Sequence, residues 1–99
     1  MRKYQSATIE KQFHEYREKW IHDTKYSSSM QLAALHPVYR KIIELGRPVV
    51  PYLINDMKST GTHWFIALSA ITDADPILEQ HAGDVTSMIQ DWVNWNNNQ

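Results

Sequence analysis

The chain has 99 residues, which is enough for one domain and too few for two. Apolar residues make up 42% of it, which excludes a disordered chain, and the net charge of −1 lacks the basic excess of a DNA-binding protein. Without cysteine, a signal-peptide core or a long apolar run, we expect a cytoplasmic protein with no disulfide, thiolate metal site or membrane contact.

The first predicted helix is amphipathic and covers residues 7–22. Its apolar residues recur at spacings of four, three and four, with charged residues between them: Ile9, Phe13, Tyr16 and Trp20. A serine among residues 27–29 is expected to cap a short second helix that reaches Leu35. His36 and Pro37 end that helix, because the residue before a proline disfavours helical geometry.

The next two predicted helices lie on either side of Gly46. Pro37 suits the first turn of a helix over residues 37–45, and Gly46 is expected to be its left-handed C-terminal cap. Arg47 and Pro48 open a fourth helix that ends before Gly61. Pro51 falls one turn into this helix and is expected to tighten its start.

The fifth predicted helix, residues 63–72 with Thr62 as N-cap, is apolar on most faces, which is typical of a central helix. Residues 77–83 are predicted to form a loop, and Asp84 to cap a last helix that carries Trp95, followed by a frayed tail over residues 96–99. No segment alternates with the period of a strand. The predicted fold class is therefore all-α: a single helical domain over residues 1–99, with five or six short helices in a compact bundle.

Two stretches carry family patterns. Residues 46–72 open with Gly-x-Pro, continue with Val49-Val50-Pro51-x-Leu53-Ile54 and Ala67-Leu68-x-x-Ile71, and resemble one HEAT-like antiparallel helix pair. Further stretches are Trp20-x-x-x-Thr24, His36-Pro37-x-Tyr39-x-x-Ile42-Ile43, His63-Trp64-Phe65-x-Ala67-Leu68-x-x-Ile71-Thr72 and Trp92-x-x-Trp95. With these, residues 20–95 resemble a family of small uncharacterised bacterial helical proteins. This resemblance implies a fold and no activity.

Two histidines next to aromatic residues are pocket candidates. His63 precedes Trp64 at a predicted helix start, a position that favours a neutral imidazole. His36 precedes another predicted helix, where its ring could cap amides or meet His63 across a groove. One hypothesis is a small enzyme or ligand-binding protein with a pocket of His36, His63 and Trp64, beside Tyr39. In the alternative, the histidines cap amides and Trp64 is a core residue, since no acid that would orient a catalytic histidine is identifiable.

The remaining patterns predict no metal, no cofactor and no catalytic residue. The five histidines fall in different segments without an i,i+4 pair, and the acids of residues 73–84 lack the glycine and oxygen spacing of a calcium loop. The serines of residues 27–29 form no nucleophile elbow, and three scattered glycines form no phosphate loop. We therefore rank an enzyme below a binding protein.

The aromatic residues favour protein binding. Four Trp and five Tyr are more than a small core easily encloses, and the predicted interface residues are Trp20, Tyr39, Trp92 and Trp95. A single helical hairpin cannot bury both of its faces, so we expect a partner protein or a second copy. The predicted function is a small cytosolic interaction module, such as an antitoxin, an immunity protein or a small subunit of a larger complex.

RNA contact is a weaker alternative. Arg40, Lys41 and Arg47 are basic, and Trp20, Tyr39 and Tyr52 are available for base stacking. Acidic residues are interspersed among these cations, however, which favours an ordinary solvated helix face.

Overall fold

The computed structural model is all-α, as predicted. It describes the backbone of residues 2–27 and 29–99, and the side chains of residues 8–27 and 29–99. That part of the chain forms six α-helices, two 3₁₀ turns and no strand. The elements are α1 (Arg2–Thr24), α2 (Met30–Ala33), α3 (Pro37–Glu44), η1 (Arg47–Val49), α4 (Val50–Thr60), α5 (Phe65–Thr72), η2 (Glu79–His81) and α6 (Val85–Asn97).

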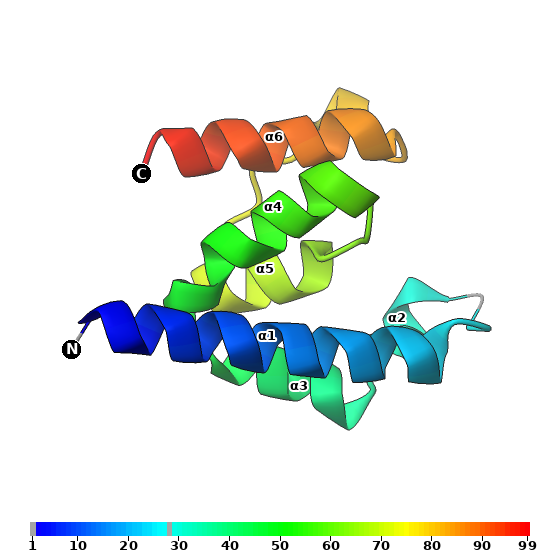
Figure 1. Cartoon of the computed structure of the whole chain (residues 1–99). Helices are drawn as coiled ribbons and strands as arrows, with labels where there is room; N and C mark the ends of the chain where they lie inside the picture. The colour runs from blue at the N-terminus through cyan, green and yellow to red at the C-terminus, as the bar shows by residue number, and fades with distance from the viewer. Residues whose placement is uncertain (1, 28) are drawn as a thin grey trace.

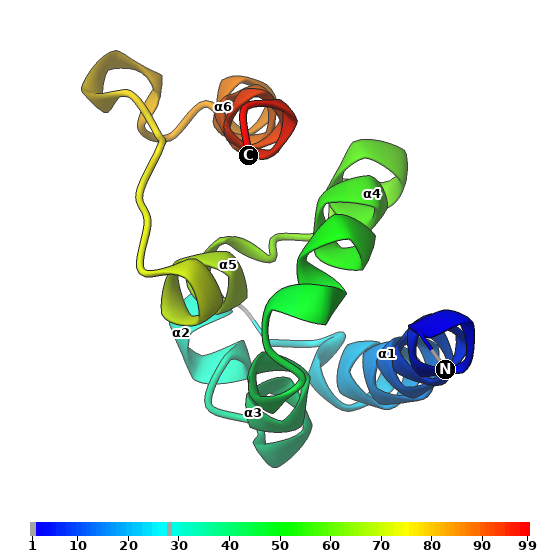
Figure 2. The same ribbon diagram turned by 90° about the vertical axis from the view of Figure 1, so that its left-hand side faces the viewer.

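The helices are stacked in three layers (Figure 1). α1 packs on α3 in the first layer, and η1 and α5 pack on these two helices from the middle layer. α4 and α5 form the middle layer and run in opposite directions, as expected for the helix pair over residues 46–72. Residues 73–97, which we call the α6 layer, complete the stack: α6 lies on α4, and the segment with η2 takes the place of a second helix (Figure 2).

α1 has 23 residues, so the prediction of short helices throughout is wrong for this element. No proline or glycine interrupts residues 2–24, and the helix therefore continues on both sides of its apolar stripe. Phe13 and Trp20 of that stripe are buried, while Ile9 and Tyr16 are half-buried against the same core.

Most helix ends follow the local rules of capping. Ser29 accepts a hydrogen bond from the Leu32 amide at 3.3 Å, and Asp84 accepts one from the Ser87 amide at 3.3 Å, as predicted. η1 precedes α4, so the start of this helix is tightened where Pro51 occupies its first turn, also as predicted. α6 extends to Asn97, two residues further than the predicted helix.

The predicted cap at Thr62 is wrong, and Gly46 has the expected positive φ but not the ψ of a left-handed helical cap. Leu45 is the C-cap of α3, and Gly46 combines a φ of +75° with an extended ψ that turns the chain into η1. α5 begins at Phe65 with Trp64 as its N-cap residue, whereas Thr62 donates its amide to the Thr60 hydroxyl in the preceding turn. Thr62 therefore belongs to the turn after α4 and not to the start of α5.

The core is built around the Trp64 indole, which is fully buried. Its ring centroid lies 4.8 Å from that of Trp20, 5.6 Å from that of Phe13 and 5.6 Å from that of Tyr39. Aromatic rings at these separations and tilted angles attract one another beyond the effect of burial alone. One side chain at the start of α5 therefore joins α1 and α3 into a single core.

Hydrogen bonds of two buried aromatic side chains, Trp64 and Tyr39, hold the same helices together. Trp64 Nε1 donates to Asp56 Oδ2 at 2.8 Å, and Arg17 Nε donates to the same oxygen at 2.9 Å. Tyr39 Oη accepts the Ala67 amide at 2.8 Å, which satisfies a donor in the first turn of α5. Burial raises the pKa of Tyr39 to about 12, so this hydroxyl stays protonated.

α5 is not buried on every side, which corrects the expectation of a central helix. Ala67 and Leu68 are fully buried, but Ile66 is 36% exposed and Ser69 and Ala70 also face solvent. The physical reason is the position of α6, which packs mainly on α4 and leaves one side of α5 open.

We expect Tyr39→Phe to lower the free energy of unfolding by about 1–3 kcal/mol, because the buried Ala67 amide loses its acceptor. Urea denaturation followed by circular dichroism measures this change. Tyr26→Phe is the matched control, since Tyr26 is 90% exposed and its replacement is expected to change stability by less than about 0.5 kcal/mol. Equal effects of the two substitutions would show that the Tyr39 hydroxyl has no structural role.

Candidate functional site

Three of the four predicted interface aromatics are core residues, which corrects that prediction. Tyr39 and Trp92 are fully buried, and Trp20 is 4% exposed with its Nε1 donating to the Ala33 carbonyl at 2.8 Å. These side chains have no surface to offer a partner. Trp95 alone of the four is half-buried, and it packs against Trp92 with ring centroids 5.3 Å apart.

His36 caps a helix, as one of the two hypotheses for it predicted. Its Nδ1 accepts the Val38 amide at 3.0 Å, and its Nε2 lies 2.9 Å from Asp23 Oδ2. Because Nδ1 is an acceptor, the proton of the neutral ring is on Nε2, which donates to Asp23. Hydrogen bonds from His22, Lys19 and His36 lower the pKa of Asp23 to about 2. Both ring nitrogens of His36 are thus in structural use.

The structure does not bring His36, His63 and Trp64 to one pocket. The His63 ring is half-buried beside Phe65, with centroids 5.5 Å apart, and Trp64 lies inside the core. Four surface hollows that are lined by described residues contain none of these three side chains. The pocket predicted from the adjacent residues His63 and Trp64 is therefore not one of these hollows.

Of the three aromatic residues proposed for base stacking, Trp20 and Tyr39 are buried, and Tyr52 is half-buried with its ring centroid 6.5 Å from that of Phe13. Arg40 lies 3.8 Å from Glu44, and the Lys41 ammonium lies 6.0 Å from the Tyr16 ring centroid. Arg40 and Lys41 therefore lie on a solvated helix face that also carries an acidic residue, Glu44.

A hollow of about 260 Å³ between α1 and α4 has polar residues in its wall, among them His14, Asp56 and Ser59. The Asp56 carboxylate is already bonded to Arg17 and Trp64. Among the described residues, no hydrogen bond joins His14 to Ser59 or to Asp56. In the same part of the chain no three His, Asp or Glu side chains are grouped closely enough to hold a metal, and no helix is long and apolar enough to span a membrane.

The α6 layer has one fully buried apolar side chain, and most of its other apolar side chains are only half-covered. The other weakly covered stretch is at α2, where Leu32 is 64% and Leu35 is 77% exposed. α3, α4 and α5 each contribute fully buried side chains, such as Ile42, Leu53 and Leu68. In the α6 layer Trp92 is fully buried and Leu78 is 48% exposed. Six other apolar side chains of this layer are half-buried: Ile77, Val85, Met88, Ile89, Val93 and Trp95.

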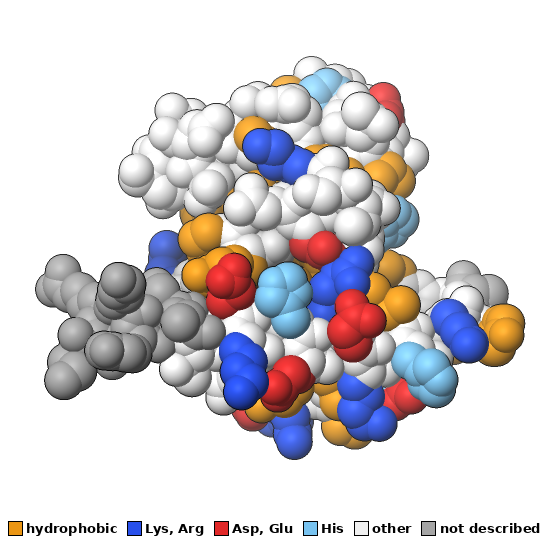
Figure 3. All heavy atoms as spheres, viewed as in Figure 1, with side chains coloured by type: hydrophobic (Ala, Val, Ile, Leu, Met, Phe, Trp, Pro, Cys, Tyr) orange, Lys and Arg blue, Asp and Glu red, His pale blue; other side chains and the backbone are white. Residues whose placement is uncertain are grey.

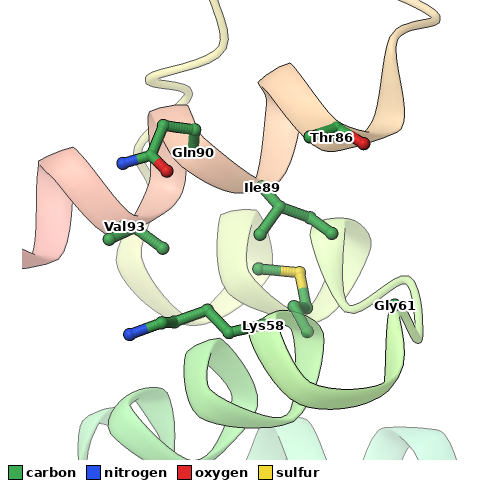
Figure 4. A pocket seen from close by; sticks show the side chains of 7 residues that line it. Lys58, Gly61, Thr86, Ile89, Gln90 and Val93 are labelled. Carbon is green, nitrogen blue, oxygen red and sulfur yellow. The ribbon is translucent and has the colours of Figure 1, made fainter.

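An open groove of about 390 Å³ runs between α4 and α6 (Figure 4). Met57, Ile89 and Val93 give it an apolar floor. The Lys58 side chain extends along one side, and Thr86 and Gln90 stand on the other. An apolar floor with a few polar groups at the rim is the usual composition of a site that binds another molecule.

Hydrogen bonds to the Asp91 side chain hold the segment with η2 against α6. This carboxylate is buried, accepts the Leu78 amide at 3.0 Å, and lies 2.8 Å from His81 Nδ1. The hydrogen bond from His81 and that from Leu78 lower the pKa of Asp91. Sequence reasoning missed this pair, although an acid directly before Trp92 of the apolar stripe was a visible signal.

The Trp92 indole differs from the Trp64 indole in its hydrogen bonding. Its Nε1 is buried, and among the residues that the structure describes it has no hydrogen-bond acceptor. The indole of Trp64, in the middle layer, does have one in Asp56. A buried donor without an acceptor costs free energy, and native proteins contain few of them.

Comparisons of the chain with protein-family models, curated proteins and solved structures give no match. The resemblance of residues 20–95 to a bacterial family is therefore carried by the sequence pattern alone. The geometry of the α6 layer is the basis for the functional argument below.

We expect Trp64→Phe to destabilise the protein more than Trp92→Phe, by about 1.5–3 kcal/mol. Both changes remove the same atoms from a fully buried site, but only Trp64 donates a hydrogen bond, to a carboxylate. Urea denaturation of the two variants gives the difference directly. Equal losses would mean that the Asp56 contact adds nothing to the packing.

Asp91 is expected to make stability depend on pH in the acid range. A carboxylate whose pKa is lowered by folding stabilises the native state above its unfolded pKa of about 3.9, and this contribution is lost as the pH falls through the folded pKa. Between about pH 6 and about pH 3, the urea midpoint of Asp91→Asn should therefore fall less than that of the wild type. Asp75→Asn, at an exposed carboxylate, should keep the wild-type pH dependence.

Proposed function

We propose that this protein is a helical interaction module that binds a partner protein through the α6 layer. The observation that carries the proposal is the difference in burial between layers. The first two layers share an aromatic core around Trp64, whereas the α6 layer leaves seven apolar side chains half-covered or exposed around its one fully buried residue. Stacked helical repeats normally end in a polar outer face, and an apolar end is completed by a neighbour.

The other end of the stack supports this assignment by contrast. Charged side chains of both signs cover the face of α1, while the face over α6 in the same view carries mostly uncharged polar atoms (Figure 3). α1 thus has a charged outer surface, and the surface over α6 in this view is largely uncharged. A partner seated on α6 would cover Ile89, Val93 and Trp95, the kind of apolar and aromatic residues that carry most of the binding energy in interfaces.

Antitoxins, immunity proteins and small subunits of larger complexes are the kinds of protein that fit this proposal. Each acts by covering a surface of another protein, which requires a stable small fold and no catalytic groups of its own. An enzyme is the poorer fit, because His36 is engaged at both nitrogens and, among the described residues, no hydrogen bond joins His14 to Ser59 in the α1–α4 hollow.

Site-specific photocross-linking in the source cell tests the proposal. A benzophenone amino acid replaces Gln90, which is exposed at the rim of the α4–α6 groove, or Glu15, which is exposed on α1. We expect one defined protein to be cross-linked from position 90 and not from position 15, because only the first position faces the proposed interface. Mass spectrometry identifies the protein, and the reciprocal experiment from its own surface confirms the contact.

Val93→Thr provides the control for specificity, since it keeps the β-branched shape and makes the groove floor polar. The cross-link from position 90 should then fall several-fold while the circular dichroism spectrum is unchanged. Equal cross-linking from positions 90 and 15, or no loss with Val93→Thr, would contradict the proposal.

A further inference from the structure

The charges of this chain are divided sharply along the sequence. All ten Lys and Arg residues lie within residues 1–58, and none follows Lys58. Residues 59–99 contain five acidic residues: Asp73, Asp75, Glu79, Asp84 and Asp91. The net charge of −1 therefore conceals a basic first part and an acidic second part, and all five acids belong to the α6 layer.

The five carboxylates are not in equivalent states. Asp91 is bonded to His81 and Leu78, and Asp84 caps α6 through Ser87. The side chains of Asp73, Asp75 and Glu79 are exposed, and within the described part of the chain they form no ion pair and no hydrogen bond. These three negative charges are thus available to a partner.

Two of the available carboxylates border an apolar pocket on the side of α6 away from α4. The pocket has a volume of about 380 Å³ and lies between the η2 segment and α6. Ile77, Leu78 and Met88 give it apolar walls, and Asp75 and Glu79 lie at its edge. Such a pocket suits an apolar side chain that is followed closely by a positive charge.

A second copy of this chain is a poor occupant. A symmetric pair through the α6 layers would bring the same carboxylates face to face. A head-to-tail pair would place the pocket on α1, whose outer face is polar and of mixed charge. The exposed Leu32 and Leu35 at α2 are accompanied by Lys25, but its ammonium lies over the Tyr26 ring at 5.3 Å.

We infer that the α6 layer binds a basic amphipathic helix of a different protein, with an apolar residue in the Ile77–Met88 pocket and Lys or Arg against Asp75 and Glu79. The inference rests on the proposed function and adds the chemistry of the partner. A helix presents apolar side chains at i, i+3 and i+4 with other residues on either side. One helix can therefore place an apolar side chain in the pocket and a basic side chain at its edge. The excess of carboxylates also attracts such a helix before contact and speeds its association.

A designed peptide tests this chemistry without knowledge of the natural partner. The probe is a fluorescent amphipathic helical peptide of Leu and Lys, and its counterpart carries Glu at every Lys position. Fluorescence anisotropy with the full-length protein should show binding of the first peptide and not of the second. We expect Asp75→Asn/Glu79→Gln to raise the Kd of the Lys peptide about tenfold, because two charge pairs at the pocket edge are lost.

The matched control is Glu10→Gln/Glu15→Gln, which removes two exposed carboxylates from α1 and changes the net charge equally. It should change the Kd less than about twofold, because these positions lie outside the pocket. Met88→Ala should also weaken binding of the Lys peptide, because it removes part of the apolar wall of the pocket. Circular dichroism confirms that each variant is folded.

Three results would overturn the inference. They are equal weakening by the two double variants, equal binding of the Glu peptide, and self-association in sedimentation that Asp75→Asn/Glu79→Gln abolishes. If the Lys peptide shows no selective binding while the cross-link from position 90 persists, the α6 layer is an interface but its partner is not basic. If both fail, the proposed function itself is wrong.

Discussion

The packing of the Trp64 indole is the interaction on which the rest of this fold depends. Trp64 lies at the start of a short helix, yet it contacts aromatic rings from α1 and α3 and donates to a carboxylate on α4. Four helices are thereby joined through one side chain. Because the indole contacts three aromatic rings and also donates its hydrogen bond, it holds the first two layers together.

The third layer contributes one apolar residue, Trp92, to the fully buried core. α6 contacts α4, while the segment before it is held largely by the Asp91 carboxylate through Leu78 and His81. The layer adds little to the central aromatic cluster, and its own apolar side chains are only half-covered. The fold thus separates a part with a fully buried aromatic cluster from a part whose apolar surface is only half-covered.

Local structure could be predicted from the sequence because helix periodicity and capping depend on residues close together in the chain. Ser29, Pro37, Pro51 and Asp84 have the roles that their positions indicated. Which aromatic residues face solvent could not be predicted, because that depends on contacts between layers. Trp92 and Trp95 lie on the same stripe of one helix, yet only Trp92 is fully buried, and nothing near them in sequence distinguishes the two. The division of charge at Lys58 was readable from the sequence, but its meaning required the pocket beside Asp75 and Glu79.

The end of the cationic residues at Lys58 has a practical consequence for anyone studying this molecule. Amine-reactive reagents and lysine acylation cannot modify any side chain in residues 59–99, since the last primary amine of a side chain is at the rim of the α4–α6 groove. Trypsin cleaves after Lys and Arg, so it releases α5 and α6 together in one long fragment. Footprinting of this surface therefore calls for carbodiimide chemistry at its carboxylates and for a protease that cuts at acidic or aromatic residues.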